Sequence, residues 1–263
     1  MIDIINNPLA LIGRATLKFF YSVGKLSSFT FKSVISCFSL PFYFRQLLKQ
    51  LIDIGYYSLP IVGLTTLFTG MVLALQSYTG FSRFAAESAI PTVVVLSITR
   101  ELGPVMAGLM VAGRIGAYIA AEIGTMRVTE QIDALSTLST NPYRYLIAPR
   151  IIAGTLMLPI LVLVGNVIGV FGGFLVSVYK LNFNPANYIF QTWHYLEPHD
   201  VTSGLIKAAV FGFIITLMGC FCGFNSQRGA QGVGRATTNA VVSAAILILI
   251  SNYLLTGMFF SGR

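Results

Sequence analysis

The stretch from Ile151 to Tyr179 reads IIAGTLMLPILVLVGNVIGVFGGFLVSVY, and it decides the fold class of this chain. It carries no charged side chain and lies between Arg150 and Lys180. At a rise of about 1.5 Å per residue, such a helix is longer than a bilayer hydrocarbon core of about 30 Å. Three further charge-free runs cover residues 54–82, 208–227 and 236–262. The sequence therefore predicts an all-α, polytopic membrane helix bundle.

The composition of the whole chain supports a membrane protein. Of its 263 residues, 55% are hydrophobic and 10% are charged, whereas a soluble domain has about 25% charged residues. These values exclude a disordered protein, a disulfide scaffold and most soluble enzymes. Cys37, Cys220 and Cys222 form no C-x-x-C pair, so no metal site is expected.

One apolar region, residues 87–125, contains charged side chains. After Glu87, which begins it, the charged residues are Arg100, Glu101, Arg114 and Glu122. Splitting the region at Gly103-Pro104 would leave a first part of about a dozen residues, which is too short to cross a membrane. We therefore expect one long helix with a kink at Pro104, and five transmembrane helices in total.

The charges within this span are expected to face away from lipid, because a charge at the bilayer centre costs about 2.5–3.5 kcal/mol. On an uninterrupted helix, Arg100, Arg114 and Glu122 share one face within about 80°. Lys207 begins the fourth span and is placed to pair with Glu101. Two interpretations are open: a polar lining for an amphipathic substrate, and a structural network of ion pairs.

Small residues recur every four positions in several spans. Examples are Gly108/Ala112/Gly116/Ala120/Gly124, Gly165/Gly169/Gly173 and Gly219/Gly223. Such spacing lets helix backbones approach closely in lipid. It predicts a tightly packed bundle, and the contacts could lie within one chain or between two.

The lysines and arginines predict the orientation of the chain. Eleven of the 17 lie before the first span, or in the loops that join spans two to three and four to five. Since cations accumulate in cytoplasmic segments, the N-terminus is expected in the cytoplasm and the C-terminus on the outer side.

Residues 1–50 are predicted to form an interfacial segment, and residues 51–263 the transmembrane domain. One stripe of the first helix is basic and contains Arg14, Lys18, Lys25 and Lys32. The other side is apolar and contains Ile12, Ala15, Phe19, Val23 and Leu26. This pattern is typical of an amphipathic helix in the membrane interface, with a solvated tail as the alternative, and it gives no reason to expect a nucleic-acid partner. A second short helix is expected before Asp53.

A short amphipathic helix is predicted between spans two and three, at about residues 129–140. Thr129 is the expected N-cap, with Glu130 in the first turn, where the helix dipole favours an anion. Asn141-Pro142 ends the helix. Its apolar stripe contains Ile132, Leu135 and Leu138. Such a short helix is marginal alone and is expected to lie on a partner; its own bundle and lipid headgroups are the alternatives.

Sequence motifs for chemistry are absent. There is no G-x-x-x-x-G-K-[ST], hence no ATP hydrolysis by this chain, and there is no G-x-S-x-G or H-E-x-x-H. His194 and His199 lie near Trp193 and Tyr195, in a stretch typical of an interfacial anchor. We therefore expect a chain that is not an enzyme, with no catalytic residue, no metal ligand and no cofactor of its own.

Several motifs occur together, in order, along the chain. They are Arg100-Glu-Leu-Gly-Pro-Val105, Ala112-Gly-Arg-x-Gly116, Ala121-Glu-Ile-Gly-x-Met-Arg127, Thr129-Glu-Gln-Ile-Asp-Ala-Leu135, Asn141-Pro142, Pro149-Arg150 and Arg235-Ala-Thr-Thr238. From about residue 40 to the C-terminus, the chain resembles the MlaE-type permease family of ABC transporters, whose plastid relatives serve lipid import.

The resemblance implies a homodimeric phospholipid permease with five spans per chain and an N-terminal interfacial helix. It implies a separate ABC ATPase that binds ATP and Mg, an MCE-domain substrate-binding protein on the outer side and, often, a small STAS-domain subunit. It also implies the inner membrane of a Gram-negative bacterium, a periplasmic C-terminus and a role in outer-membrane lipid asymmetry. The plastid inner envelope is the alternative location.

The resemblance also implies two sets of functional residues. The short loop helix would be a coupling helix that docks on the ATPase through Thr129, Glu130, Gln131, Ile132, Asp133, Leu135 and Leu138. A lipid cavity would lie at the dimer centre, between the first, second and fifth spans. The residues matched to it are Arg100, Glu101, Lys207, Leu75, Tyr78 and Asn252. Asn252 departs from the family pattern, because some relatives have an acidic residue there.

Two other classes of function are alternatives. An ion-coupled secondary transporter or channel would use the buried charges, and inverted repeats would favour it, but the sequence shows no convincing repeat. A membrane-embedded lipid enzyme would need a nucleophile or a metal constellation, which the motifs do not provide.

Overall fold

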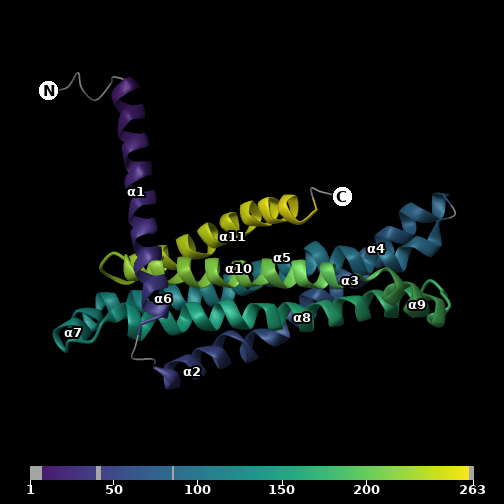
Figure 1. The fold of residues 1–263 in the computed structure, drawn as a ribbon. Coiled ribbons are helices and arrows are strands. Elements are labelled where there is room, and N and C mark those ends of the chain that lie inside the picture. The colour runs from purple at the N-terminus through teal and green to yellow at the C-terminus, as the bar shows by residue number, and fades with distance from the viewer. Residues whose placement is uncertain (1–7, 40–42, 85, 261–263) are drawn as a thin grey trace.

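Five helical segments are long and apolar enough to cross a membrane, which confirms the predicted number of spans. The computed structural model describes residues 8–39, 43–84 and 86–260, and every regular element in these ranges is a helix. The five segments are Phe44–Phe84, Glu87–Val128, Tyr143–Tyr179, Pro198–Phe224 and Ala230–Phe260. They form one bundle of aligned helices (Figure 1). The protein is therefore a multi-pass membrane protein with an all-α fold.

The first, third, fourth and fifth spans have the following helical elements. The first consists of α2 (Phe44–Ile54), η1 (Tyr56–Ser58), α3 (Leu59–Phe81) and η2 (Ser82–Phe84). The third consists of η6 (Tyr143–Ile147) and α8 (Ala148–Tyr179), the fourth is α10 (Pro198–Phe224), and the fifth is α11 (Ala230–Phe260). Two short helices, α7 (Gln131–Thr137) and α9 (Pro185–Tyr195), lie at opposite ends of the bundle, which are called the α7 end and the α9 end below (Figure 1).

The second span is one continuous helical segment, as expected, but it is not a uniform α-helix. It consists of η3 (Glu87–Ala89), α4 (Ile90–Ser97), η4 (Ile98–Leu102), α5 (Gly103–Val111), η5 (Ala112–Gly116) and α6 (Ala117–Val128). η4 and η5 are π-helical turns, in which each backbone hydrogen bond spans five residues instead of four. Each π-turn therefore shifts the helical phase of the residues that follow it.

The expectation that Arg100, Arg114 and Glu122 share one face of the second span is wrong. Their side chains bond to three different parts of the structure: Arg100 to α10, Arg114 to the start of the first span, and Glu122 to α8. The expectation assumed an unbroken period of 3.6 residues, and the π-turns at residues 98–102 and 112–116 break it.

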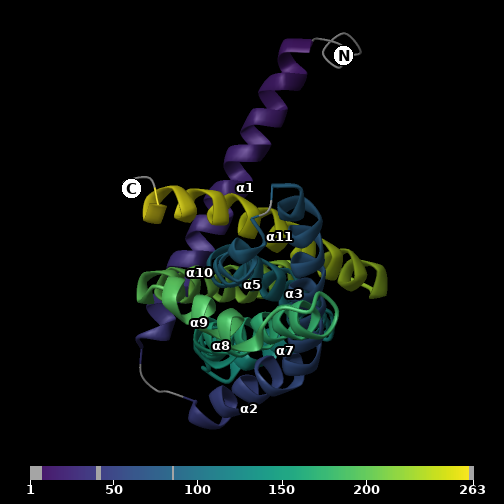
Figure 2. The same cartoon turned by 90° about the vertical axis from the view of Figure 1, so that its right-hand side faces the viewer.

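The spans pack closely because glycines line their contacts. α8 packs against both α3 and α10, and α10 also packs against α6 and α11 (Figure 2). A Cβ atom at Gly70 would overlap the carbonyl of Gly169, and one at Gly212 would overlap the carbonyl of Gly154. The predicted close backbone approach is confirmed at Gly169, where it joins two spans of the same chain.

α1 (Pro8–Cys37) runs crosswise to the spans, and its N-terminal half projects away from them (Figures 1 and 2). The buried side chain of Phe29 anchors the other half, with ring centroids 5.4 Å from Phe221 and 5.5 Å from Tyr143. In the projecting half, Phe20 and Tyr21 are exposed. A helix that runs crosswise to membrane spans is parallel to the membrane plane, which suits an interfacial helix.

The placement of α1 in the interface stays a prediction. On its apolar side, Leu26 is half-buried and Val23 is exposed. The side chains of the other three predicted residues, Ile12, Ala15 and Phe19, lie outside what the structure describes. The second short helix is α2, which extends through Asp53 instead of ending before it.

We predict that Gly70→Ala destabilises the protein, because the added methyl group meets the Gly169 carbonyl and overpacking of this kind costs about 1–3 kcal/mol. The matched control is Gly80→Ala in the same helix, where a Cβ has no neighbour within 4 Å and alanine is the better helix former. Thermal unfolding of the purified protein in one detergent measures both. Equal melting temperatures for the two variants would contradict the α3–α8 contact.

Candidate functional site

A cluster of polar side chains lies within the spans and is centred on Lys207 of α10. The Lys207 side chain is completely buried. Its Nζ donates hydrogen bonds to Glu101 Oε1 at 2.6 Å, to the Arg100 carbonyl at 2.9 Å and to Thr256 Oγ1 at 2.8 Å. An ammonium group has three donors and no acceptor, so Lys207 is fully satisfied. The predicted pair of Lys207 and Glu101 is confirmed.

Pro104 explains why a donor from another helix is needed here. Proline has no N–H, so the Arg100 carbonyl, four residues earlier, lacks the donor that an α-helix provides. Lys207 supplies a donor from the fourth span. Within a bilayer no water is available to replace a lost bond, so such a substitute has to come from the protein.

The Glu101 carboxylate is also held by the fifth span. Asn252 Nδ2 donates to Glu101 Oε2 at 2.9 Å, and the Thr256 hydroxyl lies 2.9 Å from Oε1. Asn252 and Thr256 are four residues apart on α11 and therefore share a face. The structure thus brings together Glu101, Lys207 and Asn252 as predicted, and it adds Thr256, for which the spacing from Asn252 is the only sequence signal.

A second ion pair adjoins this cluster. Arg100 Nη2 lies 2.7 Å from Asp200 Oδ1, and the Arg100 guanidinium lies 4.8 Å from the centroid of the Phe260 ring. Asp200 is fully buried, and it forms a capping box with Glu197 at the start of α10. Asp200 is a site residue absent from the sequence prediction. The pattern Glu197-Pro-x-Asp200 marks a helix start and could have revealed it.

The two ion pairs cross between the same two helices. Arg100 and Glu101 come from η4, and Asp200 and Lys207 come from α10. Each cation bonds to the acid of the other helix. The four side chains have no net formal charge, which lowers the cost of placing them within a bilayer.

An apolar groove of about 640 Å³ opens between α3 and the second span. Its walls include Phe68 and Val72 of α3, together with Leu102 and Met106 of the second span. No side chain of the polar cluster lines the groove, but Leu102 directly follows Glu101 in the sequence, so the second span carries both within one helical turn. Together they offer an apolar surface beside a polar one, as an amphipathic ligand requires.

Two residues predicted for the lipid cavity lie elsewhere on α3. The Tyr78 ring packs on Phe183, with ring centroids 6.1 Å apart, and Leu75 is half-buried. Leu73 and Gln76 line the groove in their place. With 3.6 residues per turn, positions 73 and 76 share one side of α3, and positions 75 and 78 share another.

Arg114 and Glu122 of the second span form structural bonds nearer the α7 end. Arg114 Nη1 donates to Ser58 Oγ at 2.7 Å and to the Asp53 carbonyl at 3.2 Å. Glu122 Oε2 lies 2.7 Å from Arg150 Nη2, and the Arg150 side chain is almost completely buried. For these residues the structure supports the interpretation as an ion-pair and hydrogen-bond network that fixes helix packing.

The loop helix α7 begins later than predicted. Thr129 is not an N-cap but the C-cap of α6, and its N–H donates to the Thr125 carbonyl at 2.9 Å. Glu130 is the N-cap residue and not part of the first turn, and its φ of 60° is left-handed. The physical reason is that α6 extends to Val128, so Glu130 alone reverses the direction of the chain.

The apolar stripe of α7 is divided between the bundle and the surface. Ile132 is 1% exposed and belongs to the bundle core, and Leu135 packs against that core. Leu138 is the C-cap residue and is 74% exposed. The alternative in which α7 lies on its own bundle is therefore correct for Ile132 and Leu135. The other predicted residues, Thr129, Glu130, Gln131 and Asp133, are all exposed.

The two histidines take part in aromatic contacts at the α9 end. The His194 ring stacks on Phe190 with centroids 5.5 Å apart, and His199 packs edge-on against Phe260 at 5.6 Å. Within the residues that the structure describes, no three His, Cys, Asp or Glu side chains are grouped to hold a metal ion.

Comparison with known proteins adds the family context. The family described as "Permease MlaE" matches residues 47–258. The chain is 63% identical over 249 residues to a "probable ABC transporter permease protein" of Rickettsia felis, which covers 95% of this chain and 96% of the relative. It is 35% identical over 261 residues to the "intermembrane phospholipid transport system permease protein MlaE" of Haemophilus influenzae, and the alignment covers 97% of this chain and 98% of that relative. It is 40% identical over 223 residues to the chloroplastic protein TRIGALACTOSYLDIACYLGLYCEROL 1 of Arabidopsis thaliana, and the alignment covers 84% of this chain and 63% of that relative.

We predict that Lys207→Met destabilises the protein by about 3–5 kcal/mol, because Glu101 would be left without a cation inside the bundle. Adding Glu101→Gln should recover much of this loss, since it removes the unpaired charge. Arg127→Gln is the control, because its pair with Asp133 is exposed and is worth less than about 1 kcal/mol. Denaturant unfolding measures the wild type, these three variants and the single variant Glu101→Gln, and additive losses in the double variant would show that the two residues are not coupled.

Proposed function

The chain belongs to the MlaE permease family, and on this premise we propose that it is the permease subunit of an ABC transporter that moves phospholipids. Its relative from Haemophilus influenzae is named as the permease of an intermembrane phospholipid transport system. Because this sequence has no P-loop motif, ATP and Mg²⁺ would bind to a separate ATPase subunit.

The observation that carries the proposal is the polar cluster beside the apolar groove. A phospholipid needs an apolar surface for its acyl chains and polar groups for its headgroup. The groove of about 640 Å³ provides the first, and Glu101, one residue before Leu102 of the groove, belongs to the second. The side chains of Glu101 and Arg100 keep 35% and 31% of their surface exposed, so a headgroup can reach them. Since each is already paired with an opposite charge, the cluster favours a zwitterionic or neutral polar group over a free ion.

A second copy of the chain would complete this site. Only 11% of the apolar window of α11 is buried inside one chain, compared with 33% to 56% for the other spans. Its exposed side chains include Ile246, Ile250 and Tyr253. Partly exposed charges at Glu101 and Arg100 are costly against lipid, and a second chain would cover them. These features support a homodimer with the lipid site near its centre.

The exposed side of α7 would contact the ATPase. Ile132 fixes α7 in the bundle core, and the pair of Arg127 and Asp133, with N and O atoms 2.6 Å apart, ties α7 to the end of α6. A push on α7 would therefore move α6, and with it the second span that carries Glu101. ATP-driven closure of two ATPase subunits would in this way change the width of the lipid site.

The proposed location follows from the same arrangement. Arginines gather at the α7 end, in or beside its loops: Arg127, Arg144, Arg228 and Arg235. The positive-inside rule then supports a cytoplasmic α7 end. The relative from Haemophilus influenzae supports the inner membrane of a Gram-negative bacterium, and the chloroplastic relative supports a plastid inner envelope as the alternative. An MCE-domain protein at the α9 end would exchange the phospholipid with this chain, and a STAS-domain subunit would join the ATPase.

Reconstituted lipid transfer tests the proposed function. Proteoliposomes that contain the permease and its ATPase should pass a fluorescent phospholipid to the MCE-domain protein only when ATP is present. Met106→Trp, which fills the groove, should slow transfer by about tenfold or more. Leu156→Trp, on an exposed position of α8 outside the groove, should leave the rate unchanged. ATP-independent transfer, or equal rates in both variants, would contradict the proposal.

We predict that Leu138→Asp, combined with Glu130→Lys, prevents co-purification of the ATPase, because both residues are exposed on α7 and neither contributes to the bundle core. The permease should still elute as a folded species with an unchanged melting temperature. Tyr195→Asp, an exposed position at the α9 end, is the control and should retain the ATPase. Normal ATPase recovery with the α7 variant would show that the ATPase docks elsewhere.

A further inference from the structure

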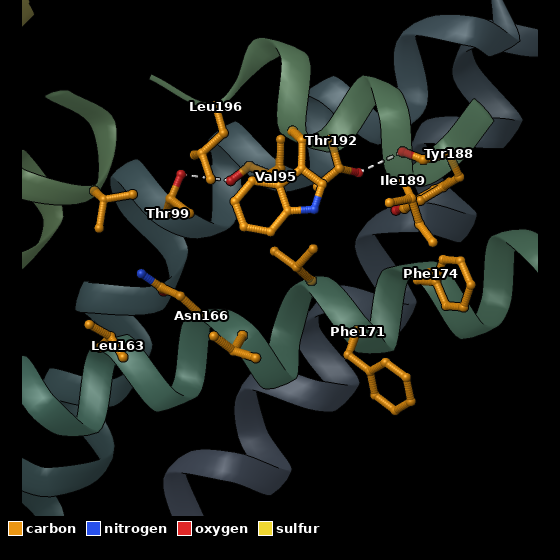
Figure 3. Close-up of a pocket in the computed structure, with 14 residues that line it drawn as sticks. Val95, Thr99, Leu163, Asn166, Phe171, Phe174, Tyr188, Ile189, Thr192 and Leu196 are labelled. Carbon is orange, nitrogen blue, oxygen red and sulfur yellow. Dashed lines mark hydrogen bonds between the residues drawn. The ribbon is translucent and has the colours of Figure 1, made fainter. Parts of the chain in front are cut away.

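An apolar hollow of about 460 Å³ lies beneath α9. Its lining comes from α4, α8, α9 and α10 and includes Val95, Leu163, Phe174 and Ile189 (Figure 3). It shares no lining residue with the groove along α3. The hollow is therefore a separate feature, which the proposed transport path does not use.

The depth of the hollow places it in the hydrocarbon region. Leu163, Val167 and Phe171 lie within α8, the third span, and they are 48%, 65% and 53% exposed. Trp193 and Tyr195 of α9 lie farther out, where aromatic side chains mark the membrane interface. Exposed side chains at the depth of the span meet acyl chains, and an empty hollow would lose dispersion contacts. An acyl chain is the occupant that this environment supplies.

A polar hollow of about 220 Å³ lies next to the apolar one. It is lined by Glu87 and Ser88 at the start of the second span and, among others, by the amide side chains of Asn184, Asn187 and Gln191. Its lining contains one acidic side chain and no lysine or arginine. Negative charge with carbonyl oxygens favours a cationic group, and the ammonium of a phospholipid headgroup is one that the bilayer provides.

Tyr188 connects the two hollows, because its side chain lines both. The residue is 2% exposed, and its hydroxyl is directed at Gly173 and Ser177 of α8 and not into the hollows. The Tyr188 ring therefore forms a shared wall of the two hollows. A lipid that fills both would place its ester and phosphate groups, which lie between its chains and its headgroup, beside this wall.

We infer that this pair of hollows binds one phospholipid of the adjacent leaflet, with an acyl chain beneath α9 and an ammonium headgroup beside Glu87. The lipid would lie against the back of the polar cluster, since Thr99 and Val201 line the hollow and directly adjoin Arg100 and Asp200 in the sequence. This second lipid site goes beyond the proposed transport function. Its occupancy needs no ATP, no ATPase and no transport.

The fluorescence of a natural tryptophan can report on this site. Trp193 is the one tryptophan in the sequence, and it lines the apolar hollow. The full chain is reconstituted in phosphatidylglycerol vesicles, which lack ammonium groups, with a small fraction of a lipid that carries bromine on its acyl chains. At equal fractions, brominated phosphatidylethanolamine should quench Trp193 about threefold more than brominated phosphatidylglycerol, as expected for one partly exposed ion pair.

Two variants separate the headgroup from the chain. Glu87→Gln should make the two brominated lipids quench equally, because it removes the charge that selects the ammonium group. Val167→Phe, which narrows the apolar hollow, should lower quenching by the phosphatidylethanolamine to the level of the phosphatidylglycerol. Ile160→Phe is the control, since it is exposed on the same helix and lies outside the hollow, and it should leave the preference intact.

Three results would overturn the inference. Equal quenching by both lipids in the wild type would show that Trp193 meets only bulk lipid. A preference that survives Glu87→Gln would show that this carboxylate does not hold the headgroup. Absence of quenching by either lipid would show that protein, such as a second copy of the chain, covers the hollow.

Discussion

The pairing of Lys207 with Glu101 inside the spans is the interaction on which the rest of the structure depends. A charge within a bilayer is tolerated only where the protein supplies its partners. Here the lysine uses all three of its donors, and the carboxylate receives bonds from the fourth and fifth spans. The second, fourth and fifth spans are thereby fixed to one another at a single depth. The pair of Arg100 and Asp200 repeats the same link between the second and fourth spans.

The same constraint accounts for the irregular backbone of the second span. The charged side chains of this helix bond to three different neighbours. One π-turn precedes Arg114, which bonds to Ser58, and both π-turns precede Glu122, which bonds to Arg150, so each turn changes the phase of the charges that follow it. Close glycine contacts, such as Gly70 with Gly169, bring the backbones near enough for these short bonds. The ion pairs and hydrogen bonds between the spans therefore depend on the close packing that the small residues allow.

Features that depend on segment length and charge could be predicted from the sequence. Features that depend on local backbone geometry could not. Five spans and the pair of Lys207 and Glu101 followed from charge-free runs and from the cost of charge in lipid. The prediction that Arg100 and Arg114 share one face was wrong, because a π-turn cannot be recognised from the spacing of hydrophobic residues in the sequence. The predicted start of α7 was wrong, because Glu130 adopts a left-handed backbone conformation that is not expected for a glutamate. Asp200 was missed because its role depends on a helix start that brings it to Arg100.

We propose that a phospholipid occupies the groove near the Lys207–Glu101 cluster and leaves it when the ATPase works. A photoreactive amino acid in place of Phe68, which lines the groove, measures this directly through the mass of its lipid adduct. We expect a phospholipid adduct whose yield falls several-fold when ATP is added to the complete transporter. A photoreactive residue in place of Ile160, on an exposed part of α8 outside the groove, should give a yield that ATP does not change. Equal, ATP-independent yields at both positions would show that the groove holds no transported phospholipid.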